Sequence, residues 1–300
     1  MKTEMTHREP TSNEYSRLSS CHPKLRHCRS LALTCLLGLS WLSPTNLCAA
    51  QDQPDTKTQA EVKGDPPVQK RAERPRPVED SRRSYLGRVL AKPMSHLGAP
   101  WLIRPEREEE ERASESFKQL KLVKGMNVCD LGCGNGYWTL PMARDVGEDG
   151  TVYAVDIQRE MLQKLRQRSS KYKLNNIEPV LGKVDDPNLP PNKVDLVLMV
   201  DVYHEFSHPE SMLWGIRRSL TSKGVVALLE YREEDPGVPI KPLHKMSKRQ
   251  IMKEYGANGF KLVREYNKLP WQHLMFFARD DSPLEKIEPV PAQQVLKDLE

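Results

Sequence analysis

The positions of apolar and polar residues predict strands and helices in regular alternation over residues 123–280. Short continuous apolar runs rich in Val, Leu and Ile indicate buried strands, and apolar residues at helical spacing indicate amphipathic helices between them. The expected strands are 126–131, 151–156, 177–182, 194–201, 224–231, 260–266 and 273–279. The expected helices are 137–146, 159–172, 209–220 and 247–259, preceded by a largely solvated helix at 106–120.

This alternation predicts a parallel sheet with helices on both faces, because strands that are buried on both sides form continuous apolar runs. Residues 267–272, which join the last two expected strands, are too few for a helical crossover, so these strands should form a hairpin. We therefore expect an α/β fold: a doubly wound, Rossmann-like, seven-stranded sheet with a terminal antiparallel β-hairpin.

Residues 1–50 have the pattern of a secretory signal peptide. Basic residues precede an apolar run at 31–42, and Pro44 and the small residues 48–50 follow it. We expect cleavage near Ala50 and an exported, periplasmic or envelope-associated protein that can meet a membrane surface through its leader. The alternative is a leader without function, which would leave the protein in the cytoplasm.

The rest of the chain divides by composition. Residues 51–84 are rich in Pro and charged residues and have almost no large apolar ones, so they predict a disordered linker. We expect an N-terminal helical lid segment at 85–122, the main domain at 123–280 and a C-terminal tail at 281–300.

Charge and cysteine content narrow the choice of partners. The chain has a net charge of +5 and a pI near 8.8, but the basic excess lies wholly in the first hundred residues. Residues 101–300 are close to neutral, which disfavours nucleic acid as a partner. Four of the six cysteines lie in the leader, and Cys129 and Cys133 should be reduced thiols. No His or Cys pair in the main domain has a ligand-like spacing, so we expect no metal site.

A glycine-rich turn follows the first expected strand of the main domain and leads directly into a helix. Glycines at such a turn allow a ligand to approach the main chain. Asp156, at the end of the next strand, can accept both hydroxyls of a ribose, so a nucleoside-bearing cofactor is expected. Gly132, Gly134 and Gly136 are each separated by one residue, whereas dinucleotide folds place two residues before the third glycine. A nicotinamide-dependent oxidoreductase is therefore the weaker enzyme reading.

The run 130–136 (DLGCGNG) in this position resembles the first motif of the class I S-adenosylmethionine-dependent methyltransferases. The resemblance covers about residues 123–279, including the final hairpin. Two further segments, EYREEDP at 230–236 and PWQH at 270–273, are similar to a small bacterial subgroup of these enzymes that carries an N-terminal leader. The resemblance implies the class I methyltransferase fold, with S-adenosyl-L-methionine as cofactor.

The same resemblance implies a set of cofactor-binding residues, which are Asp130, Gly132, Gly134, Gly136, Asp156, Ile157, Asp185 and Asp201. Asp130 and the glycines would lie at the methionine end. Asp156 would bind the ribose, and Ile157 would lie against the adenine. Asp185 is the candidate for the adenine amino group, although Asp185 and Asp186 before Pro187 also fit a simple turn.

The acceptor side is expected at residues 201–206 (DVYHEF), because ligands of open α/β sheets bind beyond the carboxyl ends of the strands. His204 is the candidate base for an acceptor that carries a proton, with Glu205 or Asp201 orienting it. Tyr203 is expected to direct the acceptor. The alternative for His204 is a capping or packing histidine near a helix start.

Two other segments can contribute to the site. Glu230 ends another expected strand and can face the same region, while residues 233–235 are expected to form a solvated loop. Residues 98–104 can fold over the cofactor as a lid, with Arg104 near its carboxylate, although plain packing is an equal alternative.

Together these features predict a methyltransferase (EC 2.1.1.-) that uses S-adenosylmethionine and acts on a small molecule. The leader suggests a quinone-like or other lipid-associated acceptor. Two alternatives stay open at this point: a methyltransferase-fold protein that binds without catalysis, and an NAD(P)-dependent oxidoreductase. The oligomeric state has no signal in the sequence.

Overall fold

The computed structural model describes residues 84–300. The leader expected at 1–50 and the linker expected at 51–84, apart from its last residue, lie outside the described residues. Their roles therefore stay predictions. Among residues 84–300, no helix combines the length and the apolar character needed to cross a bilayer.

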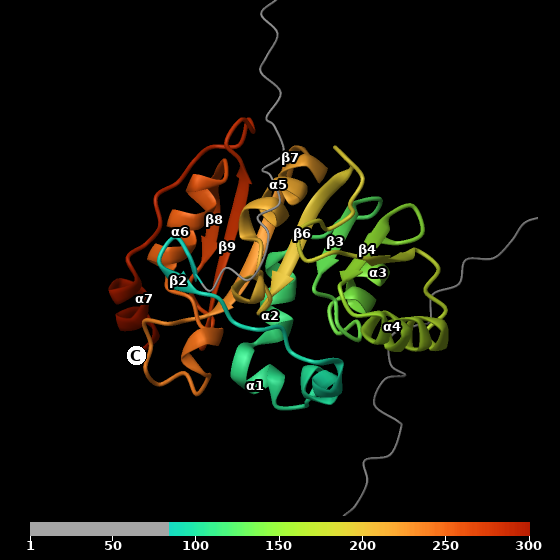
Figure 1. Ribbon diagram of the computed structural model, residues 1–300, viewed down its shortest axis with the longest axis horizontal. Coiled ribbons are helices and arrows are strands. Elements are labelled where there is room, and N and C mark those ends of the chain that lie inside the picture. Colours follow the sequence, from blue (N-terminus) through green and yellow to red (C-terminus); the bar gives the residue numbers. More distant parts are fainter. Residues whose placement is uncertain (1–83) are drawn as a thin grey trace, which may run out of the picture. The chain divides into compact units, whose positions relative to one another are not determined.

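A seven-stranded sheet forms the centre of the fold (Figure 1). Its strands are β3 (Asn127–Leu131), β4 (Thr151–Asp156), β5 (Ile177–Leu181), β6 (Val194–Val200), β7 (Leu220–Tyr231), β8 (Phe260–Tyr266) and β9 (Gln272–Arg279). Their spatial order is β5-β4-β3-β6-β7-β9-β8, and β9 is antiparallel to both of its neighbours while the other pairs are parallel. The predicted doubly wound sheet with a terminal antiparallel hairpin is confirmed.

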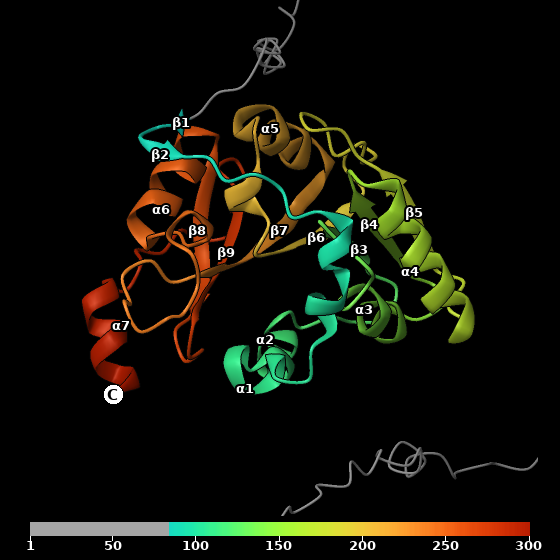
Figure 2. The ribbon, with the colours of Figure 1, turned by 60° about the horizontal axis from the view of Figure 1, so that its bottom comes forward.

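Helices cover both faces of this sheet. Four helices follow β3, β4, β6 and β7 in turn: α3 (Thr139–Val146), α4 (Arg159–Lys171), α5 (Pro209–Ser219) and α6 (Lys248–Ala257). Buried residues of α5 and α6 pack in one cluster, and those of α3 pack in another with the opposite-facing residues of the same strands. Figure 2 shows α5 and α6 on one side of the sheet and α2 and α3 on the other. Neighbouring strand residues point to opposite faces, which is why both faces are apolar.

The N-terminal part contains short elements instead of one long helix. A small antiparallel ladder joins β1 (Ser84–Tyr85) to β2 (Arg88–Val89), and a 3-10 helix η1 follows at His96–Ile103. The helix expected at 106–120 is interrupted, giving α1 (Arg107–Glu111) and α2 (Ala113–Gln119). Arg112 between them has a φ of 50°, and the Glu108 carboxylate accepts hydrogen bonds from the backbone and side chain of Ser114. The left-handed Arg112 therefore ends α1 where the charge pattern predicted continuity, and the contact with Glu108 holds the first turn of α2.

The C-terminal residues also form a helix that the sequence did not predict, α7 (Ala292–Leu299). Its Val295 is completely buried. The segment before it is held by Lys248, whose Nζ donates to Glu265 at 2.9 Å and to the Val290 carbonyl at 2.8 Å. The residues expected as a tail therefore pack against the domain. Two further 3-10 turns, η2 (Tyr203–Glu205) and η3 (Pro242–His244), lie at the edge of the site.

Candidate active site

A cavity of about 590 Å³ lies at the carboxyl ends of the central strands. Residues that end or follow β3, β4, β6 and β7 line it, together with side chains from the segments 92–107 and 239–244. The chain order reverses between β3 and β6, because β3 pairs with β4 on one side and with β6 on the other. Ligands of open α/β sheets bind at such a switch point.

The glycine turn after β3 forms one wall of the cavity. Gly132 and Gly134 have φ angles of +78° and +52°, which favour glycine, and both line the cavity. A Cβ atom at Gly132 would lie 2.5 Å from Val202 Cγ2, and one at Gly134 would lie 2.6 Å from Leu102 Cδ1. The turn therefore brings bare backbone to the cavity, as expected for a cradle that holds a ligand.

Asp156 lies on the cavity beside this turn. Its carboxylate accepts hydrogen bonds from the backbone N–H of Gly134 at 3.0 Å and of Gln158 at 2.8 Å. Burial raises the pKa of the Asp156 carboxyl, and these two backbone donors oppose the rise. Each carboxylate oxygen can accept more than one hydrogen bond, so both can still bind a hydroxyl pair. Ile157 also lines the cavity and supplies an apolar surface.

Asp130 lies under the turn and not on the cavity wall. Its side chain is buried and accepts a hydrogen bond from Thr139 Oγ1 at 2.5 Å. Burial raises the pKa of this carboxyl from 3.8 to about 6; the Asp156 charge adds to the rise, while the Thr139 hydrogen bond and Arg107 oppose it.

Like Asp130, the expected cofactor residues Gly136 and Asp185 do not line the cavity. A Cβ at Gly136 would lie 2.4 Å from Leu165 Cδ1, so this glycine allows α4 to pack closely against the turn. After β5, Lys183 and Val184 line the cavity and Asp185 does not. The Lys183 N–H donates to the Asp186 carbonyl at 2.8 Å, which closes a turn. The position of Asp185 fits the turn alternative and not the expected contact with an adenine.

Asp201 follows β6 directly and lines the cavity with a φ of +52°. Gln272 Nε2 donates to both of its carboxylate oxygens at 2.9 Å, and Arg107 Nη2 lies 3.9 Å away. Burial and the charges of Glu111 and Glu230 raise its pKa well above the ordinary value. An unusual backbone angle held by surrounding contacts is typical of a functional site.

The arginine on the cavity is Arg107 and not Arg104. Arg104 is paired with Glu110 and Glu111 and does not line the cavity. Arg107 is 4% exposed, donates to Glu111 at 2.6 Å and reaches the Leu102 carbonyl at 3.0 Å. Trp101 and Leu102 of the expected lid segment do line the cavity, and Asn135 anchors this segment through the Ala99 carbonyl.

His204 is the buried group on the acceptor side of the cavity. Glu230 near the end of β7 lies behind it, with Oε2 at 2.6 Å from His204 Nδ1 and Oε1 accepting from the His204 N–H at 3.2 Å. The sequence predicted that Glu205 or Asp201 would orient His204, and the structure assigns this contact to Glu230 instead. The adjacent parallel strands β6 and β7 bring the two residues together although 26 positions separate them.

The contact with Glu230 also sets the proton affinity of His204. Burial alone lowers the pKa of the imidazole, but the charge and the hydrogen bond of Glu230 raise it more, so the pKa lies above the ordinary 6.5. With Nδ1 held by Glu230, Nε2 is the nitrogen that remains for other partners. A carboxylate that orients an imidazole in this way is an arrangement that supports proton transfer.

Tyr203 does not occupy the predicted position. It is completely buried, and its hydroxyl donates to Glu254 Oε2 at 2.8 Å. Its ring packs against Phe206 and Tyr255. Tyr203 is not on the cavity wall and therefore cannot direct an acceptor there.

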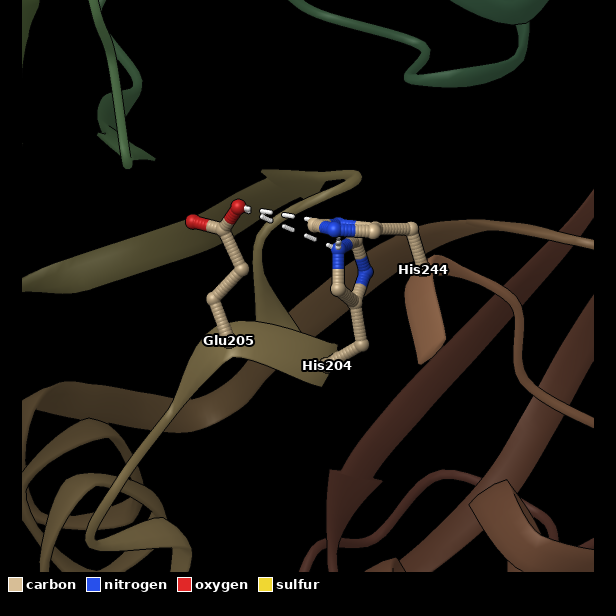
Figure 3. Close-up of side chains that lie close together, drawn as sticks. All are labelled: His204, Glu205 and His244. Carbon is tan, nitrogen blue, oxygen red and sulfur yellow. Dashed lines mark hydrogen bonds and ion pairs between the residues drawn. The ribbon is translucent and has the colours of Figure 1, made fainter. Parts of the chain in front are cut away.

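Glu205 and His244 complete the acceptor side (Figure 3). The Glu205 carboxylate accepts from the Met94 N–H at 3.1 Å, and burial raises its pKa to about 7. His244 in η3 places Nδ1 at 3.0 Å from His204 Nε2. Burial, His204 and Lys241 lower the pKa of His244. Of these residues, His244 had no predicted role, because it lies 40 positions after His204 and no spacing pattern links the two.

The segment 233–235 is less solvated than predicted. His273 Nε2 lies 2.9 Å from Glu234 Oε2, and Glu234 also accepts from the Lys248 N–H at 2.7 Å. The pKa of Glu234 is lowered because these contacts outweigh its burial. Glu234 therefore ties the loop after β7 to β9 and α6.

Comparisons with known proteins agree with this architecture. The sequence profile of a family described as "Methyltransferase domain" matches residues 122–274. A solved structure described as a SAM dependent methyltransferase from Aquifex aeolicus is similar to 62% of this chain and 98% of its own, with a TM-score of 0.58 and 25% identity. Both findings agree with the class I fold that the sequence predicted.

Curated relatives have a similar identity over a smaller share of this chain. A protein of Listeria monocytogenes serotype 4a (strain HCC23) named demethylmenaquinone methyltransferase is 27% identical over 156 residues, or 52% of this chain. A protein of the same name from Geobacillus sp. (strain WCH70) is 26% identical over 167 residues, which are 56% of this chain and 71% of that protein. The chain spans 65% of the length of the Listeria protein.

Proposed function

The chain belongs to the family of methyltransferase domains, and on this premise we propose that it transfers a methyl group from S-adenosylmethionine to a small, quinone-like acceptor. One observation carries the proposal: a single cavity presents two chemically different sets of residues. Asp156 and the glycine turn after β3 form the cofactor side. His204, backed by Glu230, forms the acceptor side after β6 and β7.

The cofactor side fits S-adenosylmethionine. The backbone at Gly132 and Gly134 leaves space that a Cβ would fill, and Asp156 presents a carboxylate for the ribose hydroxyls. Buried Asp130 adds negative charge beneath the turn, as suits an ammonium group. When bound, S-adenosylmethionine supplies a methyl group on a positively charged sulfur. The sulfur keeps the electron pair of the broken bond, and S-adenosylhomocysteine is the leaving group.

The acceptor side can activate a hydroxyl group. His204 Nε2 would take the proton of an acceptor hydroxyl, and the electron-rich oxygen or its conjugated ring would then attack the methyl group. Glu230 would stabilise the imidazolium that forms, because its carboxylate lies 2.6 Å from Nδ1. The remaining rate acceleration would come from the cavity, which positions the acceptor against a methyl group that is already activated.

The walls of the cavity favour a flat, apolar acceptor. Beside the polar groups, the lining contains large apolar side chains: Met94, Trp101, Leu102, Phe206, Met212 and Ile240. Such walls suit an aromatic ring that carries oxygen substituents. The name of the relatives, demethylmenaquinone methyltransferase, supports the same class of acceptor for this chain.

The cofactor half of the proposal is tested by titration of the full chain with S-adenosylmethionine, S-adenosylhomocysteine and NADH. The two adenosyl ligands should stabilise the protein by about 2.7 kcal/mol at a hundred times their dissociation constant, and NADH should not. Asp156→Ala should lose this effect. Asp149→Ala, on an exposed turn, should keep it. Stabilisation by NADH alone would refute the proposal in favour of an oxidoreductase.

The acceptor half is tested by methyl transfer to a reduced naphthoquinone that lacks a ring methyl group. We expect labelled methyl to appear in the product, and His204→Ala should lower kcat by about 10²–10⁴-fold with cofactor binding retained. The matched control is His208→Ala, because His208 does not line the cavity. Unchanged turnover in His204→Ala would show that His204 is not the base, and failure of transfer to any hydroxylated ring would refute the acceptor class.

A further inference from the structure

Three potential metal ligands meet on the acceptor side of the cavity. His204 and Glu205 come from η2, and His244 comes from η3, which follows β7. Figure 3 shows the two imidazole rings and the carboxylate pointing toward one another. Metal sites in proteins are commonly built from such side chains, brought together from separate segments of the chain.

We propose that His204 Nε2, His244 Nδ1 and the Glu205 carboxylate bind one divalent transition-metal ion of the zinc class. The ion would complete the acceptor side and hold an oxygen atom of the acceptor. This inference rests on the proposed function for its use, but not for the binding of the ion itself.

The distances among the three atoms fit a shared ion. His204 Nε2 lies 3.0 Å from His244 Nδ1, and Glu205 Oε1 lies 4.0 Å and 3.9 Å from these two nitrogens. A point about 2.1 Å from all three atoms exists, and zinc bonds to imidazole nitrogen and carboxylate oxygen have about this length. The carboxylate is too far from either ring for a direct hydrogen bond, yet it lies at the right separation to share an ion with both.

The surroundings of His204 orient it as a ligand. Glu230 Oε2 at 2.6 Å holds the proton of the ring on Nδ1, which leaves the lone pair of Nε2 directed toward His244. Histidines that bind metals usually donate their second N–H to a carboxylate in this way. The Met94 N–H likewise donates to the Glu205 carboxylate at 3.1 Å and fixes its position.

The charges around the cluster suit a divalent cation. Two carboxylates, Glu205 and Glu230, face the imidazoles within 4.0 Å. Lys241 also lines the cavity and is a positive charge that acts on His244. A divalent ion would balance Glu205 and Glu230, both of which are largely removed from water.

The donor set indicates which ions would bind. Two imidazole nitrogens and one carboxylate suit zinc and related transition metals, whereas magnesium and calcium prefer oxygen donors. Three protein ligands leave at least one position open, as in catalytic zinc sites. All three residues line the cavity, so the open position would face the acceptor.

An ion here would change how the acceptor loses its proton. When the acceptor oxygen coordinates the ion, its O–H bond breaks at a lower pH and the proton passes to solvent water. His204 would then act as a ligand held by Glu230 and not as the base. The oxygen keeps the electron pair of the O–H bond, which activates the acceptor for methyl transfer.

The binding test uses the full chain, freed of metal by dialysis against a chelator and titrated with Zn²⁺, Co²⁺ and Mg²⁺. We expect saturable binding of Zn²⁺, a visible Co²⁺ absorption band typical of low coordination, and no comparable binding of Mg²⁺. Residues 1–50 contain four cysteines and three histidines that can also bind Zn²⁺. Binding at the proposed site is therefore measured as the difference in bound ion between the unchanged protein and its variants. His244→Ala and Glu205→Gln should each lose one bound ion or weaken its binding at least tenfold.

Matched controls separate the site from general effects. His208→Ala removes a histidine outside the cavity and should bind Zn²⁺ like the unchanged protein. Glu230→Gln should weaken binding by about 10–100-fold through the orientation of His204. Circular dichroism verifies that each variant is folded. Equal metal binding by His244→Ala, by Glu205→Gln and by the unchanged protein would overturn the proposal, and so would equal affinity for Mg²⁺.

The metal site and the methyltransferase function can fail separately. If metal-free protein and His244→Ala both methylate the quinol at the full rate, the function stands and the metal site is wrong. If Zn²⁺ binds at these residues but S-adenosylmethionine does not stabilise the protein, the metal site stands and the function is wrong. Loss of turnover in His244→Ala with cofactor binding retained, and recovery of the metal-free enzyme on addition of Zn²⁺, would support both.

Discussion

Asp130 provides a quantitative test of how burial controls the glycine turn. Its carboxyl is 3% exposed, and burial raises its pKa from 3.8 to about 6. The folded protein therefore holds this proton more tightly than the unfolded chain, in which the pKa is ordinary. Well below pH 3.8 the carboxyl is protonated in both the folded and the unfolded protein, so its burial costs no stability through ionisation there. As the pH rises from about 4 to about 6, the unfolded chain is ionised while the buried carboxyl still holds its proton, so the protein progressively loses about 3 kcal/mol of stability. One unit of pKa difference corresponds to about 1.4 kcal/mol.

Asp130→Asn removes this titration. An amide oxygen can still accept the hydrogen bond from Thr139, which lies 2.5 Å from the carboxylate. At pH 8 the variant should therefore exceed the unchanged protein in free energy of unfolding by up to about 3 kcal/mol, with the difference falling toward zero near pH 4. Urea unfolding followed by circular dichroism at several pH values measures the difference.

The same substitution should weaken cofactor binding, since it removes negative charge beneath the turn. Stability and binding would then change in opposite directions. Asp149→Asn, on an exposed turn, controls for the general loss of one negative charge. If Asp130→Asn changed the free energy of unfolding equally at pH 4 and pH 8, burial of this carboxyl would not be the cause and the reasoning would be refuted.

Two further substitutions test the packing around the site. Gly132→Ala should lower the free energy of unfolding more than Gly125→Ala. Both glycines have a positive φ, which costs a residue with a Cβ about 1–2 kcal/mol. A Cβ at Gly132 would also lie 2.5 Å from Val202, whereas one at Gly125 would meet nothing within 4 Å. Equal losses in urea unfolding would contradict the clash. Glu111→Gln should cost about 3–5 kcal/mol, because it removes the negative charge that pairs with buried Arg107 at 2.6 Å. The exposed control Glu109→Gln should leave the melting temperature within a degree or two, and a similarly small change in Glu111→Gln would show that Asp201 is a sufficient partner.

The central elements were predictable because their signals are local. The strands β4 (151–156) and β8 (260–266) have the predicted bounds, since a glycine turn precedes each of them. The hairpin of β8 and β9 followed from the short connection alone. By contrast, the break lies at the left-handed backbone of Arg112, and a contact between Glu108 and Ser114 joins the two helices; the charge pattern of residues 106–120 reveals neither.

The two sides of the site differ in the same way. Gly132, Gly134 and Asp156 belong to one βαβ unit, so their spacing was enough to predict that they meet at one cavity. The acceptor side combines His204 with Glu230 and His244, which lie 26 and 40 positions further on. Only the pairing of β6 with β7 and the return of the loop after β7 bring them together. No local sequence pattern indicates contacts between residues this far apart.

The segment 88–96 connects the two sides physically. Arg88 and Ala91 donate to the His204 carbonyl, Met94 donates to Glu205, and the His96 N–H donates to Gln158 beside Asp156. One stretch of chain before the main domain therefore contacts both the acceptor side and the cofactor side. A shift of this stretch would move Glu205 relative to Asp156, so the geometry of the cavity depends on residues that lie outside the matched range 122–274.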